Sequence, residues 1–217
     1  TVLSKDIFQE WANKTNTKFI SLPFAVNLDV FKFKNLEKKY DFSFSGALHT
    51  DFIDIRINIK RKIFQEKYLK NLSNKYLINN PLQSKYRNYS FFWSEWGATN
   101  FLGKNNTPHG KKYIELLNKS KISLNTLSAM NIFNTRFFEL MAMKSLIFCP
   151  RSTLKYDILM EDYNCIVFED DLSDFEEKLQ TLISGNYDYS HIVENAFNNS
   201  FTHTYDNRVD QLIESVF

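Results

Sequence analysis

The sequence predicts an α/β fold: a Rossmann-like, doubly wound parallel sheet in a single domain that ends in C-terminal helices. Three observations lead to this prediction. From residue 40 onward, short apolar runs alternate with stretches of helical spacing, the loops between them are short, and no internal repeat is visible. Parallel strands need crossover helices, and right-handed crossovers stack such strands into one open sheet.

The expected strands are short apolar runs, several of which end at a turn-forming residue. The first one, DFSFSG, alternates Phe42 and Phe44 with small residues and ends at Gly46. This glycine predicts either a tight turn or a close approach of the backbone to a phosphate. The expected strands are residues 41–46, 76–78, 121–125, 146–149 and 165–168.

The expected helices follow from apolar residues at a spacing of three or four. Residues 86–106 are rich in aromatic side chains but show no clean period, so no regular element is predicted there. The expected helices are residues 4–13, 53–72, 109–120, 134–144, 153–160, 172–183, 189–198 and 206–216.

The chain divides into three parts. Residues 1–39 are interpreted as a lead-in or linker from a missing N-terminal domain, because they hold one short helix and a charged, loop-like stretch. Residues 40–185 form the predicted Rossmann-like domain, and residues 186–217 form C-terminal helices that pack on it.

Composition excludes several classes of protein. The 217 residues are 43% hydrophobic with a net charge of +2, which excludes a disordered tail and allows a sizeable core. Lysines are spread along the chain and balanced by acids, so nucleic acid is not an expected partner. Cys149 and Cys165 lie in apolar runs and are expected to be buried, reduced thiols. With neither a membrane-length apolar stretch nor a signal peptide, we expect a cytoplasmic protein.

Ligands of a doubly wound sheet bind beyond the carboxyl ends of its strands. This rule selects the loops 45–49, 79–82, 125–135 and 150–153. The helix expected after Asn134 would offer free backbone N–H groups and a positive dipole end, and Arg136 would add a guanidinium suited to a diphosphate. Glu139, one turn further, could accept hydrogen bonds from two vicinal ribose hydroxyls.

Alternative interpretations stay open for each of these residues. Arg136 and Glu139 could be solvated residues at an ordinary helix start, and Arg56 and Lys60, one turn apart, could line a solvated face. Arginine is rare in this lysine-rich sequence, which makes each one a candidate for bidentate binding. The segment Trp93–Trp96 could stack a base or sugar, or form a hydrophobic lid or partner contact.

The sequence lacks the common phosphate and nucleophile motifs. With five glycines, none of them clustered, it has no P-loop, no G-x-G-x-x-G and no G-x-S-x-G. The four histidines, His49, His109, His191 and His203, have no ligand-like spacing, so no metal site is predicted.

The order of these elements resembles the C-terminal half of glycosyltransferases with two Rossmann domains (GT-B), especially the group 1 and spore-maturation-type families. The matching segments are Leu22–Asn27 with Phe31, Tyr40–Gly46 with Arg56, Tyr113, Ser120–Asn125, Asn134–Ala142, Ile166–Asp170 and Tyr205–Arg208. The resemblance covers residues 22–217.

The resemblance implies a glycosyltransferase that binds a nucleotide-diphosphate sugar donor and transfers the sugar to a glycan or other acceptor. In this family the carboxylate corresponding to Glu139 binds the ribose, and side chains and helix dipoles stabilise the leaving diphosphate without a metal or other cofactor. The expected donor-binding residues are Ser45, Gly46, Arg56, Lys60, Asn125, Asn134, Thr135, Arg136 and Glu139, and the catalytic candidates are Arg136 and Glu139.

Two positions depart from the family pattern. Asn131 stands where many retaining enzymes carry an acid, which leaves retention or inversion open, and Lys144 replaces the usual glycine after the helix. The chain has room for one Rossmann domain, so we expect the acceptor-binding half to be missing. The alternatives are a non-catalytic nucleotide- or partner-binding module and a sugar-nucleotide epimerase.

Overall fold

The structure, a computed structural model, describes residues 5–15, 19–47, 55–64, 86, 88–96, 110–128 and 131–216. Within these ranges, five parallel strands form one sheet in the order β2-β1-β3-β4-β5. The strands are β1 (Tyr40–Ala47), β2 (Phe91–Trp96), β3 (Ser120–Leu124), β4 (Leu146–Pro150) and β5 (Ile166–Phe168). The predicted parallel, Rossmann-like fold is therefore confirmed.

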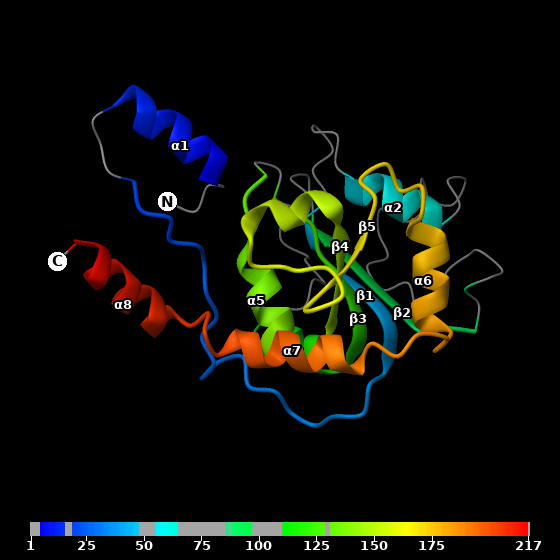
Figure 1. Ribbon diagram of the computed structural model, residues 1–217. Coiled ribbons are helices and arrows are strands. Elements are labelled where there is room, and N and C mark those ends of the chain that lie inside the picture. The colour runs from blue at the N-terminus through cyan, green and yellow to red at the C-terminus, as the bar shows by residue number, and fades with distance from the viewer. Residues whose placement is uncertain are drawn as a thin grey trace.

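Helices cover both faces of this sheet (Figure 1). Helices α2 and α6 lie on one side, and α5 and α7 lie on the other. The helical elements are α1 (Lys5–Lys14), α2 (Ile55–Ile63), α4 (Lys111–Asn118), α5 (Thr135–Ala142), the 3₁₀ helix η3 (Arg151–Tyr156), α6 (Phe175–Ile183), α7 (Ser190–Ser200) and α8 (Tyr205–Val216).

Each face of the sheet has its own apolar core. On the α2 and α6 side, Phe44 of β1 packs against Trp93 of β2, with ring centroids 4.5 Å apart. On the other side, residues of α4, α5 and α7 pack against β4 and β5 and enclose Cys149 and Cys165. Both cysteines are free and buried, as predicted.

The strand order reverses between β1 and β3. From β1 the chain moves outward to β2, and it then returns to the other side of β1 to build β3, β4 and β5. A crevice is expected at the carboxyl ends of two such strands, because the connections leave them in opposite directions. The carboxyl ends that border it here are those of Ala47 and Leu124.

Strand β2 was not predicted. Phe91, Phe92, Trp93 and Ser94 are all buried, so this strand lacks the apolar–polar alternation that marks a strand with one solvated face. The strand predicted at residues 76–78 lies outside the described residues.

Several helices differ from their predicted bounds. Helix α2 ends at Ile63, and residues 65–72 of the predicted helix 53–72 lie outside the described residues. The helix predicted at residues 153–160 is the 3₁₀ helix η3, which ends at Tyr156 because the next residue, Asp157, is left-handed with φ of 57°. Leu172 also has a positive φ, of 62°, so α6 begins at Phe175 instead of residue 172.

The lead-in segment packs against the junction of α7 and α8. Val26 forms an isolated parallel bridge with Thr204, and its N–H donates to the carbonyl of His203 at 2.9 Å. Arg208 of α8 donates from Nε to the carbonyl of Pro23 at 3.1 Å. Further along, the ammonium of Lys38 donates to the carbonyls of Ser120 and Lys144, both at 2.9 Å, and burial lowers the pKa of this lysine to about 8.

Candidate functional site

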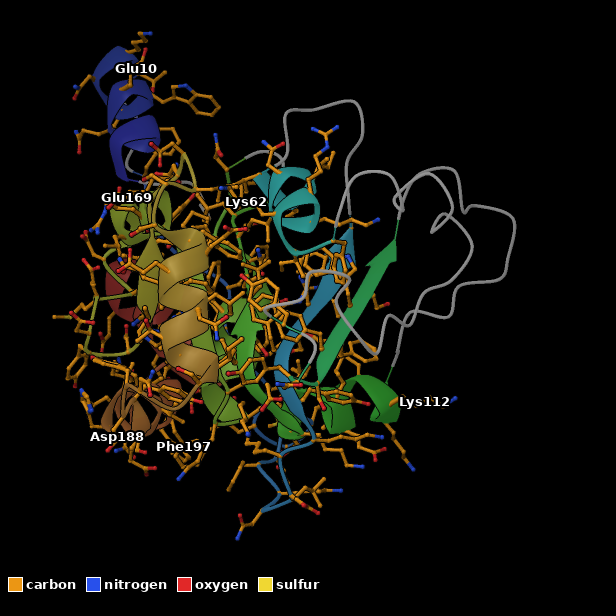
Figure 2. All side chains as sticks on the ribbon, turned by 90° about the vertical axis from the view of Figure 1, so that its right-hand side faces the viewer. Glu10, Lys62, Lys112, Glu169, Asp188 and Phe197 are labelled. Carbon is orange, nitrogen blue, oxygen red and sulfur yellow. The ribbon has the colours of Figure 1, made fainter. Side chains whose placement is uncertain are left out.

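The candidate site lies at the carboxyl ends of β1 and β3. Figure 2 shows the arrowheads of β1 and β2 pointing to the end of the molecule where Lys62 and Glu169 lie, whereas Asp188 and Phe197 lie at the opposite end. Helix α5 begins in the connection that leaves β3, so its N-terminal end belongs to the same edge of the sheet. The fold thus brings the end of β1 and the start of α5 together.

Two asparagines fix the start of α5. Asn134 is the N-cap, and its Oδ1 accepts from the backbone N–H of Arg136 at 3.2 Å, which satisfies one of the free donors of the first turn. Asn125, fully buried at the end of β3, donates from Nδ2 to the same oxygen at 3.0 Å. The Nδ2 of Asn134 donates in turn to the carbonyl of Thr126 at 2.8 Å. Thr135, the first residue of the helix, is therefore held in a fixed position relative to β3.

The guanidinium of Arg136 reaches across to β1. A Cβ atom built on Gly46 would lie 2.9 Å from Nη1 of Arg136 and 3.1 Å from the ring of Phe44. The tight turn predicted at Gly46 is wrong, because β1 continues through Ala47 and Gly46 does not have a positive φ. The missing side chain instead makes room for the guanidinium.

A tyrosine hydroxyl joins Arg136 to Glu139. Tyr113 of α4 donates from its hydroxyl to Oε2 of Glu139 at 2.7 Å, and the same hydroxyl accepts from Nε of Arg136 at 3.2 Å. Burial, more than any other cause, raises the pKa of Tyr113, and the Glu139 carboxylate adds to this against the opposing effect of Arg136. The hydroxyl therefore keeps its proton at neutral pH.

Sequence reasoning placed Tyr113 in the family resemblance but gave it no function in the site. The available signal was a tyrosine within an otherwise apolar helix face, since a buried hydroxyl needs a hydrogen-bond partner. The partner could not be identified from spacing, because α4 and α5 are separated by β3 in the sequence.

Arg56 of α2 also reaches the ends of β1 and β3, but its guanidinium contacts protein acceptors. Its Nη1 donates to the carbonyl of Ala47 at 2.5 Å, its Nε to Oγ1 of Thr126 at 2.7 Å, and its Nη2 to the carbonyl of Leu127 at 2.8 Å. Arg56 thus ties the end of β1 to the loop that follows β3. The alternative of a solvated face is wrong for Arg56 and for Lys60, because both are buried. Their contact with a diphosphate stays a prediction.

Ser45 is buried on the sheet face that carries α4 and α5. It lies beside Ser94 of β2 in the register of the two strands, and side-chain alternation puts it on the face opposite Phe44. Among the described residues the structure therefore collects Ser45, Gly46, Asn125, Asn134, Thr135, Arg136 and Glu139 around the ends of β1 and β3 and the first turns of α5.

Other predicted candidates do not join this group. Trp93 is only 2% exposed and packs on Phe44 and Phe64, so the hypothesis of base or sugar stacking is wrong for this residue, and the side chain of Trp96 lies outside the described ones. Arg151, in the predicted loop 150–153, forms ion pairs with Glu161 and Glu169 at 2.8 and 2.7 Å. The loop 79–82, His49 and His109 lie outside the described residues.

The described part of the chain shows no cluster of three or more His, Cys, Asp or Glu side chains that could hold a metal ion. None of the helices within the described ranges has the length and apolar character needed to span a bilayer.

A cavity of about 760 Å³ lies between the lead-in and α4, away from the predicted site residues. Its lining residues are Asp29, Val30, Lys32, Lys34, Leu36, Gly110, Lys111, Ile114, Glu115 and Asn118.

Comparison with known sequences decides the family. A family model described as glycosyl transferase-like matches residues 61–214, well over half of the chain. The chain belongs to this glycosyl transferase-like family. No curated protein matches its sequence.

Solved glycosyltransferases share the fold of this member of the family. The C-terminal domain of a group 1 glycosyl transferase, LpcC, from Francisella tularensis aligns with a TM-score of 0.56 at 14% identity, covering 82% of this chain and 97% of that domain. A glycosyltransferase from Rickettsia africae aligns with a TM-score of 0.60 at 14% identity, covering 98% of this chain and 61% of its own length. Sucrose-phosphate synthase from Thermosynechococcus elongatus gives 0.61 at 9% identity, covering 97% of this chain and 55% of its own length.

These alignments show that the fold is that of a GT-B C-terminal domain. The chain spans slightly more than half the length of the two longer proteins. The resemblance to group 1 glycosyltransferases is therefore confirmed at the level of family and fold, and the spore-maturation-type subfamily stays a prediction.

Proposed function

We propose that this chain binds the nucleotide-diphosphate sugar donor of a glycosyltransferase in the crevice between β1 and β3. The observation that carries the proposal is the arrangement of Arg136 and Glu139: a guanidinium against Gly46 at the end of β1, and a carboxylate one turn further along α5. A cation beside a helix N-terminus suits a diphosphate, and a carboxylate one turn away suits the ribose hydroxyls.

Each part of the proposed donor has a counterpart in the site. The first turn of α5 and Arg136 bind the diphosphate, while the buried Arg56 and Lys60 add positive charge below it. Glu139 accepts from the ribose. As the bond to the sugar breaks, negative charge grows on the diphosphate, and donors fixed in advance stabilise it without rearranging. The proposal assigns this role to side chains and a helix end and needs no metal ion.

The rest of the reaction is assigned to a partner domain. We propose that a Rossmann domain preceding this one binds the acceptor, a glycan or another surface polysaccharide, and that transfer takes place in the cytoplasm. The longer glycosyltransferases that share the fold support this arrangement, because this chain aligns with only part of each.

Nucleotide titration tests the donor site. We expect the 217-residue chain to bind UDP or GDP in calorimetry, because both carry the ribose and the diphosphate. Glu139→Ala is expected to weaken binding by about 1–3 kcal/mol, through loss of hydrogen bonds to a charged acceptor. Glu177→Ala, which removes an exposed carboxylate from α6, is the matched control and should change nothing. Absence of binding at millimolar UDP and GDP would overturn the proposal.

A further inference from the structure

We infer that Tyr113 is a positioning residue of the donor site: its hydroxyl holds Arg136 and Glu139 apart and aims each at a different part of the nucleotide. This inference rests on the proposed function, since it concerns the same crevice. It adds a residue of α4 to a site otherwise built from β1, β3 and α5.

The hydroxyl has one proton and two lone pairs, which fixes the direction of both bonds. The proton goes to Glu139, 2.7 Å away, because a carboxylate can only accept. A lone pair accepts the Nε proton of Arg136 at 3.2 Å, because a guanidinium can only donate. The ring is held at its edge by Phe31, with centroids 6.3 Å apart and planes at 85°. The hydroxyl therefore has one position and one orientation.

The bridge keeps two opposite charges from pairing. Arg136 and Glu139 are three residues apart on one helix, a spacing at which such pairs commonly form. In the described structure, however, Arg136 and Glu139 form no direct ion pair, and the two side chains meet through Tyr113. Both side chains are partly exposed: Oε1 of Glu139 takes no part in the bridge, and Nη1 of Arg136 lies beside Gly46.

Removal of the hydroxyl alone should therefore change what the side chains of Arg136 and Glu139 contact. In Tyr113→Phe the ring contact with Phe31 persists, but Nε of Arg136 and Oε2 of Glu139 lose their shared partner. Opposite charges at this spacing then pair directly, which turns the carboxylate away from the ribose. If Tyr113 had only a packing role, its substitution would weaken the binding of every ligand equally. If it is a positioning residue, its substitution reduces the preference for the nucleotide that carries the hydroxyl bound by Glu139.

The experiment compares a ribonucleotide with its 2′-deoxy counterpart by calorimetry, using UDP or GDP, whichever the wild-type chain binds more tightly. The measured quantity is the dissociation constant of the 2′-deoxy nucleotide divided by that of the ribonucleotide. We expect Glu139→Gln to reduce this ratio and Tyr113→Phe to reduce it by about 3- to 10-fold, the equivalent of one hydrogen bond. In the Glu139→Gln background, Tyr113→Phe should have no further effect on it, because the two residues act as one unit.

The matched control is Tyr89→Phe. Tyr89 packs against the apolar core on the opposite side of the sheet, where its hydroxyl accepts from Gln180 at 3.4 Å, so the control removes the same atom far from the site. Thermal unfolding midpoints of all variants are measured to verify that each is folded at the assay temperature.

The outcomes separate this inference from the proposed function. If the wild-type chain binds neither nucleotide, the proposed function fails and the inference fails with it. If Glu139→Gln reduces the ratio but Tyr113→Phe leaves it unchanged, or weakens both ligands equally, the donor site stands and Tyr113 has only a structural role. A reduced ratio in both variants supports the inference.

Discussion

At the scale of single residues, the absence of a side chain at Gly46 is as important to the site as the presence of Arg136. The guanidinium occupies the space that a Cβ would need, 2.9 Å from where that atom would stand. The sequence indicated that Gly46 was special, but both predicted reasons concerned backbone conformation or a phosphate. The true neighbour is separated by 90 positions, so no local pattern could reveal it.

Gly46→Ala should displace Arg136 while leaving the fold intact. The nearest group, Nη1 of Arg136, is the far end of a flexible side chain, and the Phe44 ring, 3.1 Å from the new Cβ, must also shift slightly, so we expect a change in the free energy of unfolding of about 1 kcal/mol. Nucleotide affinity should fall more, because the guanidinium no longer lies against β1. Urea unfolding and calorimetry with UDP or GDP measure the two effects. An unchanged affinity would contradict the assignment of Arg136 to the diphosphate.

The sequence correctly indicated that Arg56 has a specific task, but not that its guanidinium binds groups of the protein itself. Its rarity in a lysine-rich sequence predicted a task that lysine could not perform, and the structure shows a three-way fork to Ala47, Thr126 and Leu127. Sequence reasoning assigned that fork to a ligand, because its acceptors lie at the end of β1 and in the loop after β3, and only the folded sheet brings these two places together.

Arg56→Lys should therefore destabilise the fold. An ammonium cannot reproduce the planar fork, so buried carbonyl groups lose their donors, and we expect a cost of about 2 kcal/mol. Arg61→Lys, an exposed position on the same helix, is the control and should change the free energy of unfolding by less than about 0.5 kcal/mol. Equal effects of the two substitutions in urea unfolding would show that the fork does not contribute to stability.

At the scale of elements, the accuracy of the prediction depended on how each element is buried. Strands β1, β3, β4 and β5 were predicted within one or two residues, because each is an apolar run bounded by a polar or turn-forming residue. Strand β2 was missed because it is buried on both faces and begins within an aromatic-rich stretch. Helix ends were placed less well, since left-handed residues such as Asp157 and Leu172 end or delay a helix without a glycine to mark the position.

The junction of α7 and α8 should make the fold sensitive to acid. Burial, and then the charge of Arg208, lower the pKa of His203 to about 4, against an ordinary value of 6.5. Its Nδ1 lies 2.7 Å from Nη2 of Arg208, which can only donate, so the neutral ring accepts this bond. Between pH 6.5 and 4 the unfolded chain takes up a proton that the folded chain does not. Stability is therefore highest above pH 6.5 and falls on acidification.

We expect this histidine to add a slope of at most about 1.4 kcal/mol per pH unit within that window, and a smaller one because solvent reaches part of the ring. The measurement is the free energy of unfolding in urea between pH 7 and pH 4.5, for wild type and His203→Gln. The variant should lose stability less steeply, and His191→Gln, which alters an exposed histidine of α7, should follow wild type. Parallel curves for wild type and His203→Gln would show that the junction is not the sensitive element.

At the scale of the whole molecule, the sequence analysis separated the first 39 residues from the rest of the chain, whereas the structure shows contacts between the two. Residues 1–39 were interpreted as a lead-in from another domain, yet Val26 pairs with Thr204, and Arg208 donates to the carbonyls of Pro23 and Phe24. These contacts link segments more than 170 positions apart, and no periodicity reports them. The assignment of the first 39 residues to a separate domain stays a prediction.

Helix α8 carries the clearest unpartnered surface of the described chain. Figure 1 shows it lying apart from the sheet and its covering helices. Its apolar side chains follow a helical spacing and are 42–59% exposed: Tyr205, Val209, Leu212, Ile213 and Val216. A row of this kind marks a surface made for contact with another protein surface. We assign it to the proposed N-terminal Rossmann domain.

Replacement of Leu212 and Ile213 by Gln tests this assignment. In the 217-residue chain both side chains are exposed, so the double variant should change the free energy of unfolding by less than about 0.5 kcal/mol and leave nucleotide affinity unchanged. In a longer chain that carries the N-terminal domain, the same pair should slow sugar transfer, because the two halves no longer dock. Glu214→Gln, on the polar side of α8, is the control. A large loss of stability in the 217-residue chain would instead mean that the row is covered within this domain, and the docking surface would then have to be sought elsewhere.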